Sequence, residues 1–171
     1  KIGSLIAVAG KAFGMNVLVW GREGSLERAR AAGYAIAAGR QQLFETSDVF
    51  CLMLRLAAET RGMVTAADLA LMKPTALFVN TARAGLIAPE ALVEALKAGR
   101  PGHAAVDVYE NEPVLGGNHP LLKMDNALCT PHSAWIEKDM FELYFGEAFD
   151  NIVKFERGET INLVNPGVLK R

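Results

Sequence analysis

The sequence predicts an α/β fold built on a doubly wound parallel sheet. Five short runs are wholly apolar and lack the alternation of half-exposed strands, which indicates strands that are buried on both faces. Helical patterns separate these runs, and strands that alternate with helices pair in parallel through right-handed crossovers. The 171 residues are 51% hydrophobic and 22% charged, which suits one folded domain or one lobe of a larger protein.

Each expected element has a local signal. The expected strands are residues 17–20, 49–54, 76–79, 104–106 and 127–129. The expected helices are residues 5–13, 26–32, 65–72, 90–98 and about 135–157. Gly33 and Gly99 follow two of these helices, where a C-terminal cap favours positive φ. Pro89 stands where a first helical position tolerates proline. The apolar tail 161–166 is expected to form a final strand or an extended arm.

Composition argues against several classes of partner. The 18 Lys and Arg residues against 19 Asp and Glu residues leave a net charge of -1, so nothing indicates a nucleic-acid ligand. No apolar stretch is long enough to cross a bilayer, so we expect no membrane partner. Cys51 and Cys129 lie in apolar runs, which indicates buried thiols in a reducing, cytoplasmic compartment. We expect no metal site.

Side chains that can perform chemistry follow three consecutive predicted strands. Arg83 comes shortly after the run that ends at residue 79, Asp107 and Glu112 follow the run that ends at 106, and His132 follows the run that ends at 129. The carboxyl ends of parallel strands meet at one edge of the sheet, where open α/β sheets bind their ligands. We therefore expect an acid–base site with an anchor for an anion at this edge.

These residue types suit one kind of reaction. The guanidinium of Arg83 offers a fixed fork of donors that matches a carboxylate. His132 can exchange a proton near neutral pH, and a carboxylate from Glu112 on its far ring nitrogen would fix the tautomer and favour the protonated form. Together they would hold a 2-oxo acid by its carboxylate and protonate its carbonyl oxygen as a hydride arrives.

Three stretches resemble the signatures of the D-isomer-specific 2-hydroxyacid dehydrogenases, in the same order. They are residues 80–87, 105–113 and 126–134, with the His-Pro-Leu-Leu segment 119–122 before the last. The resemblance covers essentially the whole chain. It implies a Rossmann-like lobe of a homodimeric oxidoreductase that transfers a hydride between NAD(P)H and a small 2-oxo acid, forming a D-2-hydroxy acid.

The resemblance also implies a role for each catalytic residue. Arg83 would bind the substrate carboxylate and carbonyl oxygen, and His132 would be the general acid in reduction and the base in oxidation. Glu112 would orient and charge His132. Relatives that oxidise formate carry glutamine where this chain has Glu112, so Glu112 argues for a reaction that moves a proton with the hydride.

Cofactor-binding residues follow from the same resemblance. Gly3 matches the third glycine of the Gly-x-Gly-x-x-Gly fingerprint and brings Lys1 and Ile2 beside the pyrophosphate at a helix N-terminus. Asp107 and the carbonyl of Ala82 would hold the nicotinamide carboxamide. The full expected set is Lys1, Ile2, Gly3, Gly21, Arg22, Leu54, Arg55, Thr60, Thr81, Ala82, Asp107, His132 and Ala134.

The choice between NAD and NADP depends on the end of the second strand of the nucleotide-binding fold. Members that use NAD place an acidic residue there, whereas this sequence has Gly21 followed by Arg22. An arginine can bind a 2′-phosphate, which favours NADP. Glu23 is a nearby carboxylate that favours NAD, so both cofactors remain open.

The opening of the chain departs from a complete nucleotide-binding domain. The first helix follows Gly3 directly, although such domains begin with a strand and a glycine turn. Because the chain also begins with Lys1 instead of Met, we expect a lobe that lacks its first strand. Residues 1–151 are expected to form the dinucleotide-binding domain, and residues 152–171 to return to a substrate domain that is largely absent.

Two alternatives remain open at this point. Some relatives are dinucleotide-sensing corepressors that recruit partners without metabolic turnover, and the same residues would serve that function. A chain without its first strand and substrate lobe could also be inactive by itself. Outside the three signatures, His103 and His119 are interpreted as structural histidines.

Overall fold

The computed structural model describes residues 2–167 of the chain. The chain divides into two compact units between His132 and Ser133. The expected boundary after residue 151 assigns segments to the lobes of a longer protein and remains a prediction. Lys1 lies outside the described residues.

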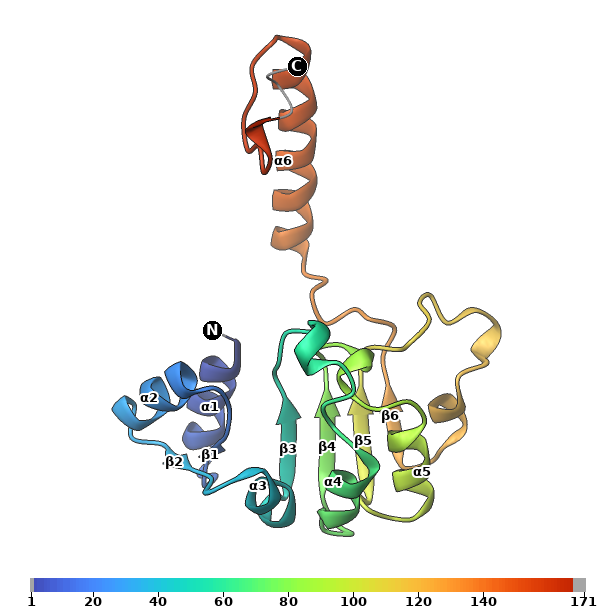
Figure 1. Ribbon diagram of the computed structural model, residues 1–171. Helices are drawn as coiled ribbons and strands as arrows, with labels where there is room; N and C mark the ends of the chain where they lie inside the picture. The colour runs from blue at the N-terminus through green and yellow to red at the C-terminus, as the bar shows by residue number, and fades with distance from the viewer. Residues whose placement is uncertain (1, 168–171) are drawn as a thin grey trace. The chain divides into compact units, whose positions relative to one another are not determined.

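The first unit contains two parallel sheets, drawn from blue to orange in Figure 1. The strands are β1 (Leu18–Val19), β2 (Ala35–Ile36), β3 (Val49–Leu52), β4 (Leu77–Asn80), β5 (His103–Val106) and β6 (Ala127–Cys129). β1 pairs with β2, while β3, β4, β5 and β6 form a second sheet in chain order, and every pairing is parallel. The predicted parallel α/β fold is confirmed.

In Figure 1, β1 and β2 lie on one side of β3, and β4, β5 and β6 lie on the other side. The chain order therefore runs one way from β1 to β2 and the opposite way from β3 to β6. That reversal of order is the mark of a doubly wound sheet, in which one more strand joins the two halves. Among residues 2–167, no strand pairs with both β1 and β3.

Helices alternate with these strands. They are α1 (Ile2–Ala12), α2 (Glu23–Ala31), α3 (Arg40–Thr46), α4 (Ala66–Leu71) and α5 (Ala91–Lys97), with short 3₁₀ turns η1 (Ala58–Thr60), η2 (Ala84–Leu86), η3 (Leu115–Gly117) and η4 (Pro120–Lys123). The four helices expected in this unit are present. The sequence reasoning missed β2 and α3, because β2 has only two residues and α3 is a short, mostly polar helix with one buried side chain, Phe44.

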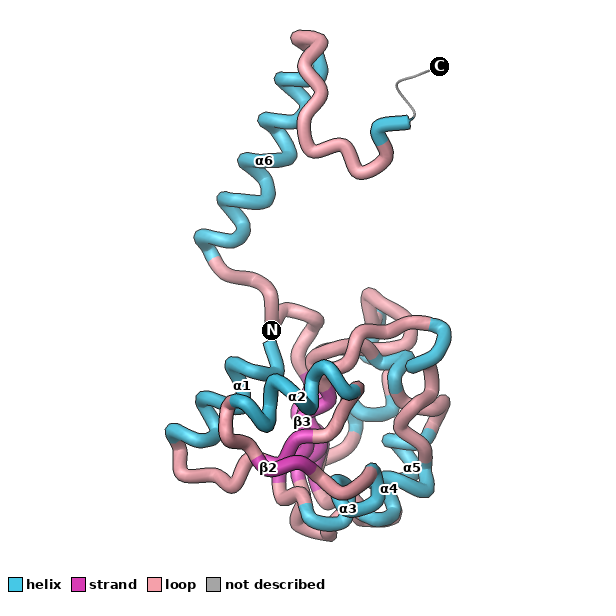
Figure 2. The backbone as a smooth tube through the Cα atoms, turned by 60° about the vertical axis from the view of Figure 1, so that its left-hand side comes forward, coloured by secondary structure: helices cyan, strands magenta, loops and turns pink. Residues whose placement is uncertain are grey.

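The core lies between the second sheet and helices α3, α4 and α5. In Figure 2 these helices lie side by side, with α4 between α3 and α5. Phe50 of β3 stacks between Phe44 of α3 and Phe78 of β4, with ring centroids 4.6 and 5.2 Å apart. Arg40 and Asp68 form an ion pair that joins α3 to α4. This packing holds β3 and β4 rigidly, and their carboxyl ends carry part of the candidate site.

The two cysteines differ slightly from expectation. Both Cys51 and Cys129 are free thiols, as expected, but they are half-buried and not fully enclosed. Burial raises the pKa of the Cys51 thiol.

The second unit contains α6 (Lys138–Glu156), the long helix that the sequence predicts. None of its side chains is buried, and Phe141 and Phe145 contact each other with ring centroids 4.4 Å apart. The strand considered for residues 161–166 does not form, because Asn162 turns the chain at φ 55° and Pro166 ends the apolar run. Among residues 2–167, α6 included, no helix combines the length and the apolar character that crossing a membrane requires.

Candidate active site

The strand register brings the predicted site residues to one edge. Leu52 of β3 pairs with Asn80 of β4, Asn80 pairs with Val106 of β5, and Val106 pairs with Cys129 of β6. These are the last residues of their strands. The segments that leave the sheet therefore start level with one another, as the argument from parallel strand ends requires.

A hydrogen bond joins His132 to Glu112. Nδ1 of His132 lies 2.6 Å from Oε2 of Glu112, and the two side chains are 31% and 32% exposed. The other carboxylate oxygen, Oε1, accepts the backbone N–H of Tyr109 at 2.7 Å. Within the described part of the chain, Nε2 of His132 has no hydrogen-bond partner. That nitrogen remains available to exchange a proton with a bound molecule.

His119 differs from His132 in that both of its ring nitrogens have hydrogen-bond partners. Nε2 of His119 lies 2.8 Å from Oε2 of Glu110, and its Nδ1 accepts the backbone N–H of Leu121 at 3.3 Å. Because both nitrogens of His119 are engaged, it cannot serve a substrate as His132 can. His103 is exposed at the start of β5.

Glu112 is held in its ionised form. Burial by itself would raise its pKa, but hydrogen bonds from the Tyr109 N–H and from His132, together with the charges of His132 and Arg83, lower the pKa below its ordinary value. The charge of Arg83 is the last of these causes, and the contact that its guanidinium makes is with the Ala82 carbonyl. The structure thus pairs two of the three predicted catalytic side chains, His132 and Glu112.

Asn80 shapes the segment that carries Arg83. Its buried amide donates to the carbonyl of Arg83 at 3.1 Å and accepts the N–H of Ala82 at 3.0 Å. Nη1 of Arg83 donates to the Ala82 carbonyl at 2.6 Å, and one lone pair of that oxygen remains. No role for Asn80 followed from the sequence, although a polar residue at the end of an apolar run was the available signal.

A second network supports β5 and β6. Asp107 is buried, and its Oδ1 accepts the hydroxyl of Thr130 at 2.5 Å, while its N–H donates to the carbonyl of Asn80 at 3.0 Å. The hydroxyl of Tyr109 donates to the Thr130 carbonyl at 2.9 Å, and burial is the first cause that raises the Tyr109 pKa. These bonds fix the position of Thr130, two residues before His132.

The residues present fit a dinucleotide. The first turn of α1, which contains Ile2 and Gly3, carries no acidic side chain, so its partial positive charge is open to a phosphate. Arg22 follows β1, is exposed, and has no side-chain partner among residues 2–167. Glu23 lies beside it, but its carboxylate is paired with Arg30 at 2.7 Å.

The remaining expected cofactor residues lie in different settings. Gly21 follows β1, Leu54 and Arg55 follow β3, and Thr81 is exposed directly after β4. Ala134 belongs to the second unit.

Thr60 is buried, and its hydroxyl accepts the Ala57 N–H at 2.8 Å and donates to the Arg55 carbonyl at 2.7 Å. Thr60 therefore shapes its own loop and does not present a free hydroxyl. No three potential metal ligands gather anywhere in the described chain.

A family profile and several known proteins match this chain. The profile of the family described as "D-isomer specific 2-hydroxyacid dehydrogenase, NAD binding domain" matches residues 1–134. A glyoxylate reductase of Aeropyrum pernix is 38% identical over 171 residues, which is 99% of this chain and 50% of that protein.

Two solved structures are also similar. A crystal structure of an oxidoreductase from Ralstonia solanacearum has a TM-score of 0.92 and 56% identity, covering 97% of this chain and 48% of that one. A phosphoglycerate oxidoreductase from Vibrio cholerae has a TM-score of 0.88 and 50% identity, covering 92% of this chain and 50% of that one. The chain thus spans about half the length of these relatives.

The lowered pKa of Glu112 predicts a pH-dependent stability. Because the folded pKa lies below that of an unfolded glutamate, about 4.3, ionised Glu112 stabilises the fold above that pH, and the contribution disappears as the pH falls through the folded value. Wild type should therefore exceed Glu112→Gln in unfolding free energy at about pH 6 but not at about pH 3, measured by urea titration.

The matched control is Glu59→Gln, which removes an exposed carboxylate that has no ion pair in the described residues. Its difference from wild type should not depend on pH in this way. An equal difference for Glu112→Gln at both pH values would contradict the pairing.

Proposed function

The chain belongs to the D-isomer-specific 2-hydroxyacid dehydrogenase family, and on this premise we propose that it is the NAD(P)-binding part of an enzyme that reduces small 2-oxo acids to D-2-hydroxy acids. The observation that carries the proposal is the His132–Glu112 pair, at 2.6 Å, with the charge of Arg83 acting on the same carboxylate. An anion anchor beside a proton-exchanging group is the arrangement that this reaction needs.

Each side chain has one task in this mechanism. Arg83 binds the carboxylate of the substrate and orients its carbonyl oxygen toward Nε2 of His132. His132 donates the Nε2 proton to that oxygen during reduction and takes a proton from the hydroxyl during oxidation. Glu112 holds Nδ1, keeps the ring oriented, and stabilises the imidazolium that reduction consumes. The bound dinucleotide supplies or accepts the hydride.

The cofactor residues complete the proposal. Ile2 and Gly3 at the start of α1 would hold the pyrophosphate, and Asp107 with the Ala82 carbonyl would hold the carboxamide of the nicotinamide. Residues 1–151 act as the dinucleotide-binding domain, and residues 152–171 lead back to a substrate domain.

NADP is the cofactor that the end of β1 favours. Arg22 is exposed without a partner in the described residues, so its guanidinium is free to bind a 2′-phosphate. Glu23 would repel that phosphate and accept ribose hydroxyls, but it is engaged by Arg30. We therefore assign NADP as the preferred cofactor, with NAD as the weaker one.

Substrate and assembly are proposed from the relatives. The similar proteins are named glyoxylate reductase and phosphoglycerate oxidoreductase, which favours a metabolic enzyme over a corepressor. We propose that the substrate is glyoxylate, hydroxypyruvate or another small 2-oxo acid, and that the protein acts as a cytoplasmic homodimer.

The direct test is an absorbance assay of NADPH and NADH oxidation with a panel of 2-oxo acids, carried out on the whole enzyme that contains this part. His132→Ala should lower kcat/KM about a thousandfold, because proton transfer to the carbonyl oxygen loses its donor. His103→Ala, which removes an exposed histidine at the start of β5, is the control and should keep full activity. Absence of turnover in wild type with every acid, or full turnover in His132→Ala, would contradict the proposal.

Arg83→Lys tests the carboxylate anchor. Lysine keeps the charge but lacks the planar fork, so kcat/KM should fall at least about a hundredfold. Arg28→Lys, an exposed arginine of α2 that bonds Ser25, is the matched control and should leave kinetics unchanged. Near-wild-type kinetics for Arg83→Lys would remove the anchor role and leave the other assignments to stand.

Arg22→Ala tests the cofactor preference. The variant should raise the Kd for NADPH about tenfold or more while leaving the Kd for NADH nearly unchanged, because only NADPH carries the 2′-phosphate. Fluorescence titration of both cofactors measures this, with Arg28→Ala as the control. Equal weakening of both cofactors would refute the preference for NADP.

A further inference from the structure

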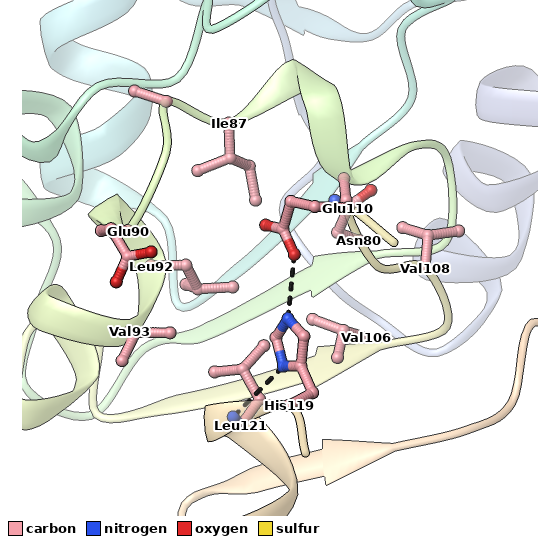
Figure 3. A pocket seen from close by; sticks show the side chains of 12 residues that line it. Asn80, Ile87, Glu90, Leu92, Val93, Val106, Val108, Glu110, His119 and Leu121 are labelled. Atoms are coloured by element: carbon pink, nitrogen blue, oxygen red, sulfur yellow. Dashed lines mark hydrogen bonds and ion pairs between the residues drawn. The ribbon is translucent and has the colours of Figure 1, made fainter. Parts of the chain in front are cut away.

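The loop after β5 carries two glutamates that face two different histidines. Glu110 and Glu112 lie two positions apart, yet Glu110 bonds His119 at 2.8 Å while Glu112 bonds His132 at 2.6 Å. Figure 3 shows the first pair, in which the dashed line joins Glu110 to the ring of His119. Each carboxylate is thus held by one imidazole, and neither His119 nor Glu110 takes part in the mechanism above.

The contacts of His119 define its protonation. Nδ1 accepts the N–H of Leu121, so this nitrogen carries no proton, and Nε2 therefore carries one and donates it to Glu110. His119 is also the N-cap of η4, whose first turn it closes through the same Nδ1 contact. A neutral ring with this tautomer bridges two parts of the loop between β5 and β6.

The ring of His119 also packs against Tyr109. The two ring centroids are 5.0 Å apart with an interplanar angle of 67°, an edge-to-face contact. Tyr109 is the residue whose N–H donates to Glu112 Oε1 and whose hydroxyl bonds the Thr130 carbonyl. His119 thereby contacts the residue that links Glu112 to the strand before His132.

The surroundings leave His119 little freedom. Its side chain is 15% exposed, and the cavity that it lines with Asn80, Val106 and Leu121 has a volume of about 20 Å³ (Figure 3). That volume holds about one water molecule. The ring is therefore fixed by packing as well as by its two hydrogen bonds.

We propose that His119 is a positioning residue for the proton-transfer pair: held by Glu110, it packs against Tyr109 and so fixes the backbone N–H that places Glu112 on the His132 ring. The inference rests on the proposed function, in which His132 exchanges the proton. A purely structural cap would affect the stability of the loop, whereas a positioning residue also affects how the His132 ring titrates, because the hydrogen bond that the ring donates to Glu112 stabilises its protonated form.

The experiment follows the His132 ring signals by NMR over a pH series in histidine-labelled protein. Glu112→Gln is the reference variant, and it should move the His132 titration midpoint to lower pH. Glu110→Ala should move the midpoint in the same direction by about 0.5 pH unit, because His119 loses its partner and Tyr109 loosens. Glu110→Gln should restore the wild-type midpoint, since its amide oxygen still accepts the Nε2 proton of His119.

Glu110→Gln also controls for charge, because it removes the same negative charge as Glu110→Ala. His119→Asn is a second variant, with an amide that can still cap η4 but no ring against Tyr109, and it should lower the midpoint as Glu110→Ala does. His103→Asn changes an exposed histidine at the start of β5 and should leave the His132 midpoint unchanged. Unfolding curves on each variant identify the pH range in which it is folded.

The outcomes separate the inference from its premise. A midpoint that moves in Glu112→Gln but stays at the wild-type value in both Glu110→Ala and His119→Asn overturns the positioning role and leaves the His132–Glu112 pair intact. Equal shifts in Glu110→Ala and Glu110→Gln also overturn it, because charge alone would then explain them. A midpoint unchanged in Glu112→Gln overturns the proposed proton-transfer pair itself.

Discussion

The hydrogen bond between Glu112 and His132 is the interaction on which the candidate site depends. It joins residues twenty positions apart on the segments after two neighbouring strands, so it forms only if β5 and β6 end level with each other. The register supplies this, since Val106 and Cys129 are paired and are the last residues of their strands. The site is thus a consequence of strand pairing in the core.

Hydrogen bonds of buried polar groups connect the paired strand ends to the segments that bear the reactive side chains. Asn80 and Asp107 are almost fully enclosed, and their bonds join the ends of β4, β5 and β6 through backbone N–H groups and the Thr130 hydroxyl. A buried polar group without a partner is costly, so each of these side chains holds its neighbours in a narrow range of positions. The positions of the exposed Arg83 and of the half-exposed pair of His132 and Glu112 depend on these buried hydrogen bonds.

Much of the fold and of the site could be predicted from the sequence because both depend on strands. Runs such as residues 76–79 are apolar enough to recognise, and parallel strands deliver their following residues to one edge. β2 and α3 were missed because a two-residue strand and a polar helix with one buried side chain leave almost no periodic signal. The apolar periodicity of residues 135–157 predicted a helix, but it could not show that none of the side chains of α6 is buried in the described residues.

The site also contains features that no pattern in the sequence encodes. His132 adopts a positive φ of 53°, a conformation that non-glycine residues take only when their surroundings determine it. Which histidine is free to exchange a proton depends on hydrogen bonds: His119 uses both ring nitrogens, and His132 uses one. Two His–Glu pairs of the same composition therefore differ in chemistry because one ring nitrogen of His132 has no partner among the described residues. The backbone N–H of Leu121, which the sequence letters do not distinguish from any other, engages the second ring nitrogen of His119.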